Sequence, residues 1–195
     1  PAGSACMLHE LRAESPETTA IDESFETLTK TLLGMHFGFD YVDETVVAEI
    51  GRVEDGTLAL GRQRYDTLII PNKTANLTVH TYHLLREFIG SGGHVIRFEE
   101  EPAYVDGELS EDLVELLSFP EVIYCENEAD AIEYALETTA RREVSVSADG
   151  HEIADIYCQV REFKNRTFYF MANVNGEETY TAHLVLRNGY DIELW

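Results

Sequence analysis

The hydrophobic pattern of the chain changes its period at Arg141, and this change limits the folds that the sequence can adopt. Up to residue 140, strand-like and helix-like segments alternate, which predicts a parallel sheet with helices packed on its faces. From there to residue 195, apolar and polar residues alternate between turn residues, which predicts antiparallel strands. We therefore expect an α/β domain over residues 1–140, followed by an antiparallel meander or partial β-sandwich over residues 141–195.

Helices are predicted in the first domain from apolar residues at helical spacing, and a shorter helical stretch starts near Asp43. Ser110 is a suitable N-cap, because Glu111 and Asp112 follow it in the first turn, where acids oppose the helix dipole. The longer helices are predicted over residues 22–35, 77–88, 110–117 and 128–139.

Strands are predicted between these helices. The segment 65–71 ends in an apolar run that Pro71 stops, so we expect a central strand buried on both faces. Asp55-Gly56 supplies the turn of a hairpin over residues 53–60. The predicted strands cover residues 6–11, 39–42, 65–71, 94–98 and 122–125.

The second part of the chain contains strand-like segments separated by four pairs of turn residues, at 149–150, 164–165, 175–176 and 188–189. Such pairs between alternating segments predict hairpins. The strands are expected over residues 144–147, 153–161, 167–172, 183–186 and 192–195. The last one reaches Trp195 without a polar tail, so we expect a β-segment truncated at its C-terminus, in a chain cut from a longer protein.

The charge of the chain restricts its partners. Asp and Glu number 37 against 14 Lys and Arg, which gives a formal net charge of −23. Such a surface repels phosphate backbones and anionic lipids, so nucleic acid and membrane are not expected as partners. A hydrophobic fraction of 44% predicts a folded domain. The sequence has no long apolar stretch and no signal-peptide pattern, which favours a soluble protein of the cytoplasm.

Motifs that carry chemistry are missing from the sequence. Neither a phosphate-binding glycine motif nor a nucleophile elbow is present, and the position after segment 94–98 holds the acids 99–101 instead. Those acids and the pair Asp43-Glu44 could be calcium ligands or a glycosidase pair, but we favour their interpretation as solvated loop residues, because acid clusters are frequent in so acidic a sequence. We therefore expect no cofactor and assign no catalytic residue.

The metal-ligating residue types form no complete site in the sequence. Cys6, Cys125 and Cys158 are isolated, which indicates neither a disulfide framework nor a zinc site. His80 and His83 have the i,i+3 spacing of a metal pair, but no third ligand is near them in the sequence. We interpret both as histidines of a helix surface and expect no metal site.

Three residues follow predicted parallel strands and form a speculative ligand-binding set: His9, Asn72 and Glu99. In open α/β sheets, ligands bind in the crevice outside the carboxyl ends of the strands. An ordinary loop role is the favoured interpretation of these three residues, and ligand binding at that crevice is the speculative alternative.

Several stretches, taken in order, resemble the region downstream of the catalytic barrel in large α-L-rhamnosidase-type glycoside hydrolases of family 106. They are Leu33–Glu44, Tyr65–Pro71, Ser91–Ile96, Arg141–Val146, Asp149-Gly150, Ile156–Arg161, Phe170–Asn175 and Ile192–Trp195. The resemblance implies a bacterial protein of carbohydrate metabolism.

The resemblance also implies a fold and partners. The fold is a flavodoxin-like, class I amidotransferase-like parallel sheet flanked by helices, similar to the trimerisation domain of family 42 β-galactosidases, with an antiparallel β-segment after it. In such enzymes the catalytic acids belong to the preceding barrel, for which this chain has no room. The expected partners are therefore the catalytic barrel of the parent chain and further copies of this chain.

Three functions follow from these observations. The first is a non-catalytic structural or oligomerisation module of a larger glycoside hydrolase, α-L-rhamnosidase-like or β-galactosidase-like. The second is a divergent amidotransferase-like hydrolase that uses Cys125 or Cys6 as its nucleophile. The third is a carbohydrate-binding module that uses exposed aromatic residues such as Tyr180, Tyr190 and Trp195.

Overall fold

The computed structural model describes residues 16–99, 101–126, 129–187 and 193, and the chain divides into two units. The first unit contains the residues up to 28 and residues 41–140. The second contains residues 29–40 and the chain from residue 141 onward. The predicted segment 6–11 and residue His9 lie outside the described residues.

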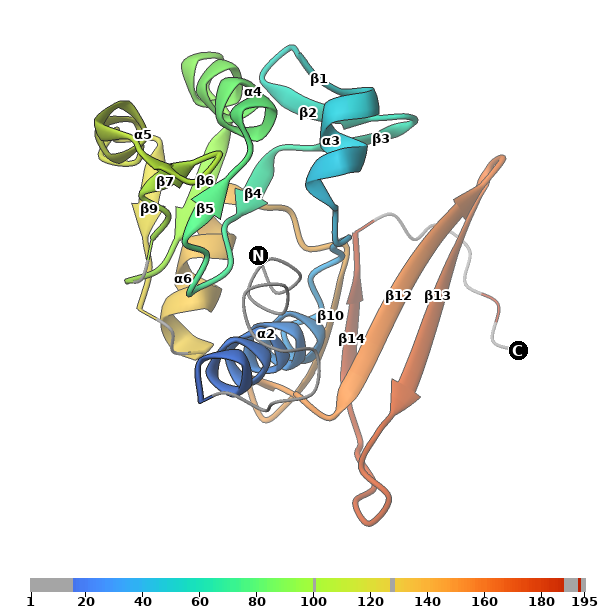
Figure 1. Ribbon diagram of the computed structural model, residues 1–195. Helices are drawn as coiled ribbons and strands as arrows, with labels where there is room; N and C mark the ends of the chain where they lie inside the picture. The colour runs from blue at the N-terminus through green and yellow to red at the C-terminus, as the bar shows by residue number, and fades with distance from the viewer. Residues whose placement is uncertain (1–15, 100, 127–128, 188–192, 194–195) are drawn as a thin grey trace. The chain divides into compact units, whose positions relative to one another are not determined.

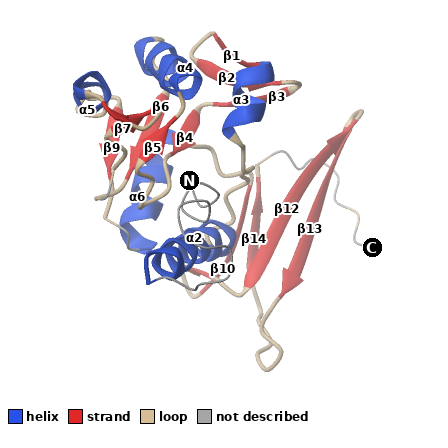
Figure 2. Cartoon of the chain, viewed as in Figure 1, coloured by secondary structure: helices blue, strands red, loops and turns tan. Residues whose placement is uncertain are grey.

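The first unit is a mixed α/β structure around a parallel sheet (Figure 2). Its strands, in the order β4-β6-β9, are β4 (Thr67–Ile69), β6 (His94–Arg97) and β9 (Val122–Tyr124). Val95 and Ile96 of β6 are fully buried, and they point to opposite faces of the sheet. The fold class predicted from the sequence is confirmed at this level, as a parallel sheet with helices followed by antiparallel strands.

The expectation that segment 65–71 forms a central strand stays a prediction, because the predicted strand 6–11 lies outside the described residues. Within the described residues, β4 pairs only with β6, and its three residues are half-buried. Among the three described strands, β6 lies in the middle, with β4 on one side and β9 on the other. An apolar run identifies a strand that is covered on its faces, but it contains no information on how many neighbours the strand has.

Five helices are present in the described part of the chain. They are α2 (Pro16–Gly34), α3 (Glu44–Ile50), α4 (Val79–Gly90), α5 (Glu111–Leu116) and α6 (Ala129–Thr139). Asp43, Thr78 and Ser110 cap α3, α4 and α5, each by accepting a hydrogen bond from a backbone N–H of the first turn. The predicted helices are confirmed, although α2 starts six residues earlier than its apolar pattern.

Helices α4 and α5 supply most of one hydrophobic core cluster in the first unit. The buried members of this core are Leu58, Ile70, Leu77, Tyr82, Leu85, Phe88, Ile89, Val95, Leu113, Leu116 and Leu117. Gly93, between α4 and β6, lies so close to Phe88 that a Cβ there would overlap the phenyl ring. The tight turn into β6 therefore depends on a residue without a side chain.

Two small sheets complete the first unit. One contains β1 (Gly51–Glu54), β2 (Thr57–Leu60) and β3 (Gln63–Tyr65), and the other β5 (Asn76–Leu77), β7 (Tyr104–Val105) and β8 (Glu108–Leu109). The β1–β2 hairpin turns at Asp55 and Gly56, whose φ angles of +50° and +74° fit the predicted turn. The strand expected at 39–42 is wrong, because these residues form a loop in which Tyr41 packs on Phe25 at 4.6 Å between ring centroids.

The second unit contains two antiparallel sheets. One has the order β11-β10-β14, from β10 (Val144–Ala148), β11 (His151–Glu152) and β14 (His183–Leu186). The other is a long two-stranded ribbon of β12 (Ile156–Phe163) and β13 (Arg166–Asn173), called the β12–β13 ribbon below (Figure 1).

The order of these strands corrects part of the predicted meander. The turns at 149–150 and 164–165 join paired strands. The turn at 175–176 does not, because β13 pairs with β12 while β14 pairs with β10. A turn pair indicates a reversal of the chain, whereas long-range pairing decides which strands become neighbours.

One face of the β12–β13 ribbon packs against the core of the second unit. Val144, Val146 and Ile153 form this core, and the side chains of Ile156, Cys158, Val160 and Tyr169 lie against it. Among the residues that the structure describes, no helix has the length and apolarity of a membrane span.

Candidate functional site

The structure places Asn72 and Glu99 at the same edge of the parallel sheet. Ile69 of β4 lies opposite Ile96 of β6, and Asn72 and Glu99 each lie three positions after these two paired residues. Asn72 is half-buried and Glu99 is exposed. The Oδ1 atom of Asn72 accepts a hydrogen bond from the backbone N–H of Lys73 at 3.1 Å. Their predicted role in ligand binding stays a prediction, as does that of His9.

The loop after β4 is stabilised from within. Both the backbone N–H and the hydroxyl of Thr74 donate to the carbonyl of Pro71, at 3.2 and 2.6 Å. Thr74 is buried, and Lys73 has a φ of +65°. The loop thus has a defined conformation, which holds Asn72 in position beside the sheet.

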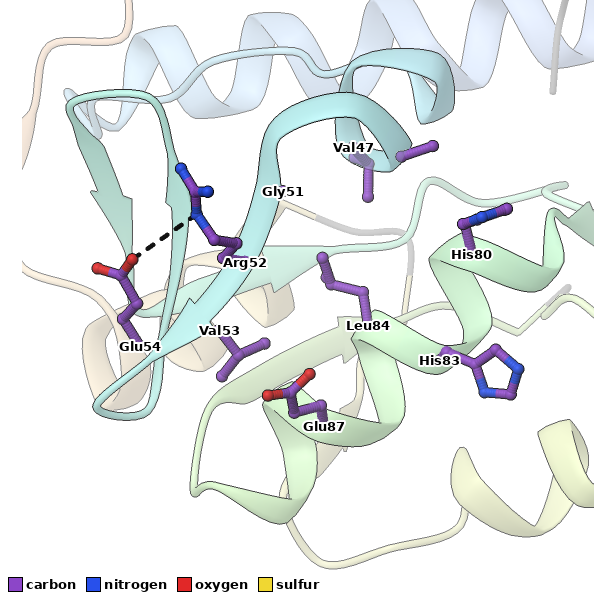
Figure 3. A pocket seen from close by; sticks show the side chains of 10 residues that line it. Val47, Gly51, Arg52, Val53, Glu54, His80, His83, Leu84 and Glu87 are labelled. Atoms are coloured by element: carbon purple, nitrogen blue, oxygen red, sulfur yellow. Dashed lines mark ion pairs between the residues drawn. The ribbon is translucent and has the colours of Figure 1, made fainter.

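A hollow of about 400 Å³ lies between α3, β1 and α4 (Figure 3). Its walls combine apolar and polar residues: Val47, Ala48, Gly51, Arg52, Val53, Glu54, His80, His83, Leu84 and Glu87. Arg52 and Glu54 form an ion pair of 3.8 Å on β1. A Cβ at Gly51 would overlap the carbonyl of Val47, so the chain needs a glycine where α3 passes into β1.

His80 and His83 both line this hollow from exposed positions on α4. Sequence reasoning identified them as a pair at i,i+3, and the structure adds Glu87 as a third polar group on the same helix. Over the described ranges, no three His, Cys, Asp or Glu side chains are arranged to hold a metal ion. The hollow therefore offers two imidazoles and a carboxylate without a complete coordination shell.

A buried polar network lies in the second unit around Glu152. Its Oε2 atom is 2.7 Å from Nδ1 of His36, whose side chain is fully buried. Its Oε1 atom accepts hydrogen bonds from Nη1 of Arg142 at 2.5 Å and from Oγ of Ser145 at 2.6 Å. The backbone N–H of Val146 donates to Oε2 at 3.2 Å. One carboxylate thus satisfies donors from separate parts of the chain.

This network is a structural feature that sequence reasoning missed. His36 has a φ of +61° and lies 116 residues before Glu152, so no local pattern connects the two. The guanidinium of Arg142 also lies 4.8 Å from the ring centroid of Phe37. Ser145 donates to Glu152 and not to the histidine, so the arrangement is not that of an activated serine nucleophile.

The two described cysteines have environments that oppose nucleophilic chemistry. Burial, with a smaller contribution from Glu126, raises the pKa of the Cys125 thiol to about 11. Burial, with a smaller contribution from Glu152, raises the pKa of Cys158 to about 11 as well. A reactive cysteine needs a lowered pKa, because the thiolate is the nucleophile. Cys6 lies outside the described residues.

Tyr180, one of the aromatics predicted to bind sugar, is half-buried and already engaged. Its hydroxyl donates to Oδ2 of Asp155 at 2.5 Å, and this bond raises the pKa of Tyr180. Hydrogen bonds from Asn175 and Tyr180 lower the pKa of Asp155. Tyr190 and Trp195 lie outside the described residues.

Comparison with known proteins finds a similar backbone structure but no similar sequence. No protein-family profile matches the sequence, and no curated protein matches it either. An apo exo-carrageenase of family GH42 from Bacteroides ovatus matches the backbone with a TM-score of 0.52 and 10% sequence identity. The match covers 84% of this chain and 25% of that chain. At this identity the likeness shows a shared fold, and this chain spans a quarter of the length of the enzyme.

The comparison supports the predicted fold, because the similar structure is that of a glycoside hydrolase of family 42. The likeness is to a protein of family 42, which is the family of the trimerisation domain named in the sequence analysis. The resemblance to the α-L-rhamnosidase type of family 106 remains an expectation.

Proposed function

We propose that the chain is a non-catalytic accessory module of a larger glycoside hydrolase. The observation that carries the proposal is the backbone likeness to the GH42 exo-carrageenase over 84% of this chain. Because that likeness occupies only 25% of the enzyme, the rest of such a protein has room for a separate catalytic barrel. The parent would be of the α-L-rhamnosidase or β-galactosidase type.

In this proposal, residues 1–140 form a flavodoxin-like, class I amidotransferase-like domain, and residues 141–195 belong to the β-domain that follows it. The raised pKa values of Cys125 and Cys158 support a scaffold without an amidotransferase nucleophile.

An exposed apolar face on α3 supports a role in assembly. Val46 and Ile50 lie one turn apart on this short helix, and both are exposed, as are Tyr41 and Val42 just before it. Neighbouring exposed apolar residues are typical of surfaces that contact another protein or domain. The partners that we propose are the catalytic barrel of the parent chain and a second copy of this chain.

The proposal is tested on the chain itself, first by activity. Incubation with aryl galactosides, aryl rhamnosides and glutamine should release product no faster than a buffer blank. If the chain hydrolyses a substrate faster than the buffer blank, and this activity remains after the chain is purified again, a non-catalytic role is contradicted.

Self-association is measured by sedimentation velocity over a range of concentrations. The variant V46E/I50E should shift the chain toward monomer, because it places two charges in the proposed contact. The control A48E adds a charge at an exposed position on a different side of the same helix and should leave the distribution unchanged. An unchanged distribution in V46E/I50E would remove α3 from the assembly surface.

A further inference from the structure

The outer face of the β12–β13 ribbon combines aromatic rings with hydrogen-bond donors in successive rows. The pairs of opposite residues are Gln159 with Phe170, Arg161 with Phe168, and Phe163 with Arg166. Side chains of directly opposite residues lie on the same face of an antiparallel pair, and successive residues alternate between faces. Each of these three rows therefore presents one phenyl ring and one side chain that donates hydrogen bonds.

These side chains face away from the core of the second unit. The opposite face of the ribbon carries Ile156, Cys158, Val160 and Tyr169, which pack against that core. On the outer face, Phe163, Phe168 and Phe170 are 62%, 40% and 57% exposed. Three large exposed rings in adjacent rows form a contiguous apolar surface, and such surfaces mark binding sites.

The charge of this face is opposite to that of the chain as a whole. Within the ribbon, Glu162 is the only acid, and it lies opposite Thr167 on the inner face. Neither Arg161 nor Arg166 forms an ion pair with any residue that the structure describes, and the guanidinium of Arg161 donates to the carbonyl of Val160 at 3.2 Å. Lys164 adds a third cation at the tip, with Nζ 5.2 Å from the ring centroid of Phe163.

The area and the charge of the face indicate its ligand. Three rows, each occupying two residues at about 3.4 Å per residue, across two strands, give an area on the order of 200–300 Å². A stable protein–protein contact needs about 800 Å² on each partner, so the face is too small to hold a second protein by itself. A narrow row of rings and donors suits an extended ligand chain instead.

We infer that the outer face of the β12–β13 ribbon binds an anionic polysaccharide, in which carboxylate or sulfate groups contact Arg161 and Arg166 and sugar faces pack on the phenyl rings. Guanidinium groups match both kinds of oxyanion. Nucleic acid fits less well, because each nucleotide carries a phosphate and binding needs many cations. The second unit does not supply that many cations, because it has ten acidic residues against seven basic ones. This binding does not depend on the assembly role proposed above.

The inference is tested by affinity electrophoresis of the chain in gels that contain polygalacturonate, a sulfated galactan, a neutral galactan or oligothymidylate. We expect one or both anionic polysaccharides to retard the chain, and the neutral galactan to have no effect. Retardation by polygalacturonate alone assigns carboxylates as the ligand groups, and retardation by the sulfated galactan alone assigns sulfate esters. Both results support the inference.

Two double variants locate the site. F168A/F170A removes two rings and R161Q/R166Q removes two charges, and each should weaken binding about tenfold or more, because stacking on one ring or contact with one guanidinium is worth that much in comparable sites. The matched controls lie in the first unit: F119A removes an exposed ring and R62Q/R86Q removes two exposed charges. Circular dichroism and melting temperature check that every variant is folded.

Several results would overturn the inference. These are no retardation by either anionic polysaccharide, equal retardation of the ribbon variants and the wild type, or stronger retardation by oligothymidylate. A dimer in sedimentation that F168A/F170A abolishes would instead make the face a protein contact. V46E/I50E can leave self-association unchanged while the chain still binds polysaccharide, and polysaccharide binding can be absent while V46E/I50E disrupts self-association. The two proposals can therefore fail independently.

Discussion

Replacement of Glu152 by Gln should destabilise the second unit. The carboxylate receives hydrogen bonds from Arg142, Ser145 and Val146 and lies 2.7 Å from His36. An amide of the same shape removes the negative charge and turns one acceptor into a donor that faces the donors of its neighbours. Arg142, with 16% of its side chain exposed, then loses the charged carboxylate that accepts its hydrogen bond.

The magnitude follows from these contacts. Hydrogen bonds to charged groups contribute about 1.5–3 kcal/mol each, and breaking a fully buried ion pair costs about 3–5 kcal/mol. Because Glu152 and Arg142 retain 22% and 16% exposure, solvent screens part of that cost. We expect a loss of about 2–3 kcal/mol in the free energy of unfolding, or about 4–12 °C in melting temperature for a chain of this size.

Urea unfolding followed by circular dichroism and by the fluorescence of the aromatic residues measures this loss. The matched control is Glu143→Gln, which removes a carboxylate paired with Arg187 at 3.3 Å on the surface, and which should cost less than about 0.5 kcal/mol. If Glu152→Gln unfolds within about 0.5 kcal/mol of the wild type, the network does not stabilise the unit and the reasoning is refuted.

Three further predictions concern other residues. Gly93→Ala should destabilise the first unit by about 1–3 kcal/mol, since its Cβ would overlap the buried ring of Phe88, whereas Gly90→Ala, with open space around it, should be nearly neutral in the same melts. Ser110→Ala should cost about 1 kcal/mol through loss of the cap of α5, and Ser110→Asp should restore most of it; equal melting of all three chains would contradict the cap. Cys125 should react with iodoacetamide at pH 7.5 at least tenfold more slowly in the folded chain than in urea, because its pKa is about 11 in the folded chain against 9.0 unfolded, and fast labelling of folded Cys125, located by peptide mapping, would refute this. The raised pKa also means that burial of the neutral thiol stabilises the folded chain below pH 9, and this contribution to the free energy of unfolding should decline between pH 9 and 11.

Local features of the fold were predictable from the sequence, and pairings between distant segments were not. Asp55-Gly56 and Ser110 act within a few residues of themselves, so the hairpin and the helix start could be identified from their neighbours. Segment 39–42 has the composition of a strand, but it has no sheet partner among the described residues and forms a loop. β-propensity expresses a fit to a half-buried sheet surface, and that surface is supplied by other segments.

The candidate sites divide in the same way. The positions of Asn72 and Glu99 at one sheet edge could be predicted, because parallel strands bring their carboxyl ends together. The network around Glu152 could not, because His36 reaches it across 116 residues. The outer face of the ribbon is visible in the sequence as Phe, Arg and Gln residues at every second position, but only the register of β12 with β13 shows which ring lies beside which arginine.

The position of β10 between β11 and β14 has a consequence for the order of folding. Ser147 pairs with His183, so this contact closes a loop of more than thirty residues, whereas β12 and β13 meet across the two residues of their turn. Closing a long loop costs more entropy than closing a short one, and a ribbon that zips up early shortens the effective loop. During synthesis, β10 would keep one unpaired edge until His183 has left the ribosome, and for that interval the nascent chain would expose a site for pairing with other strands.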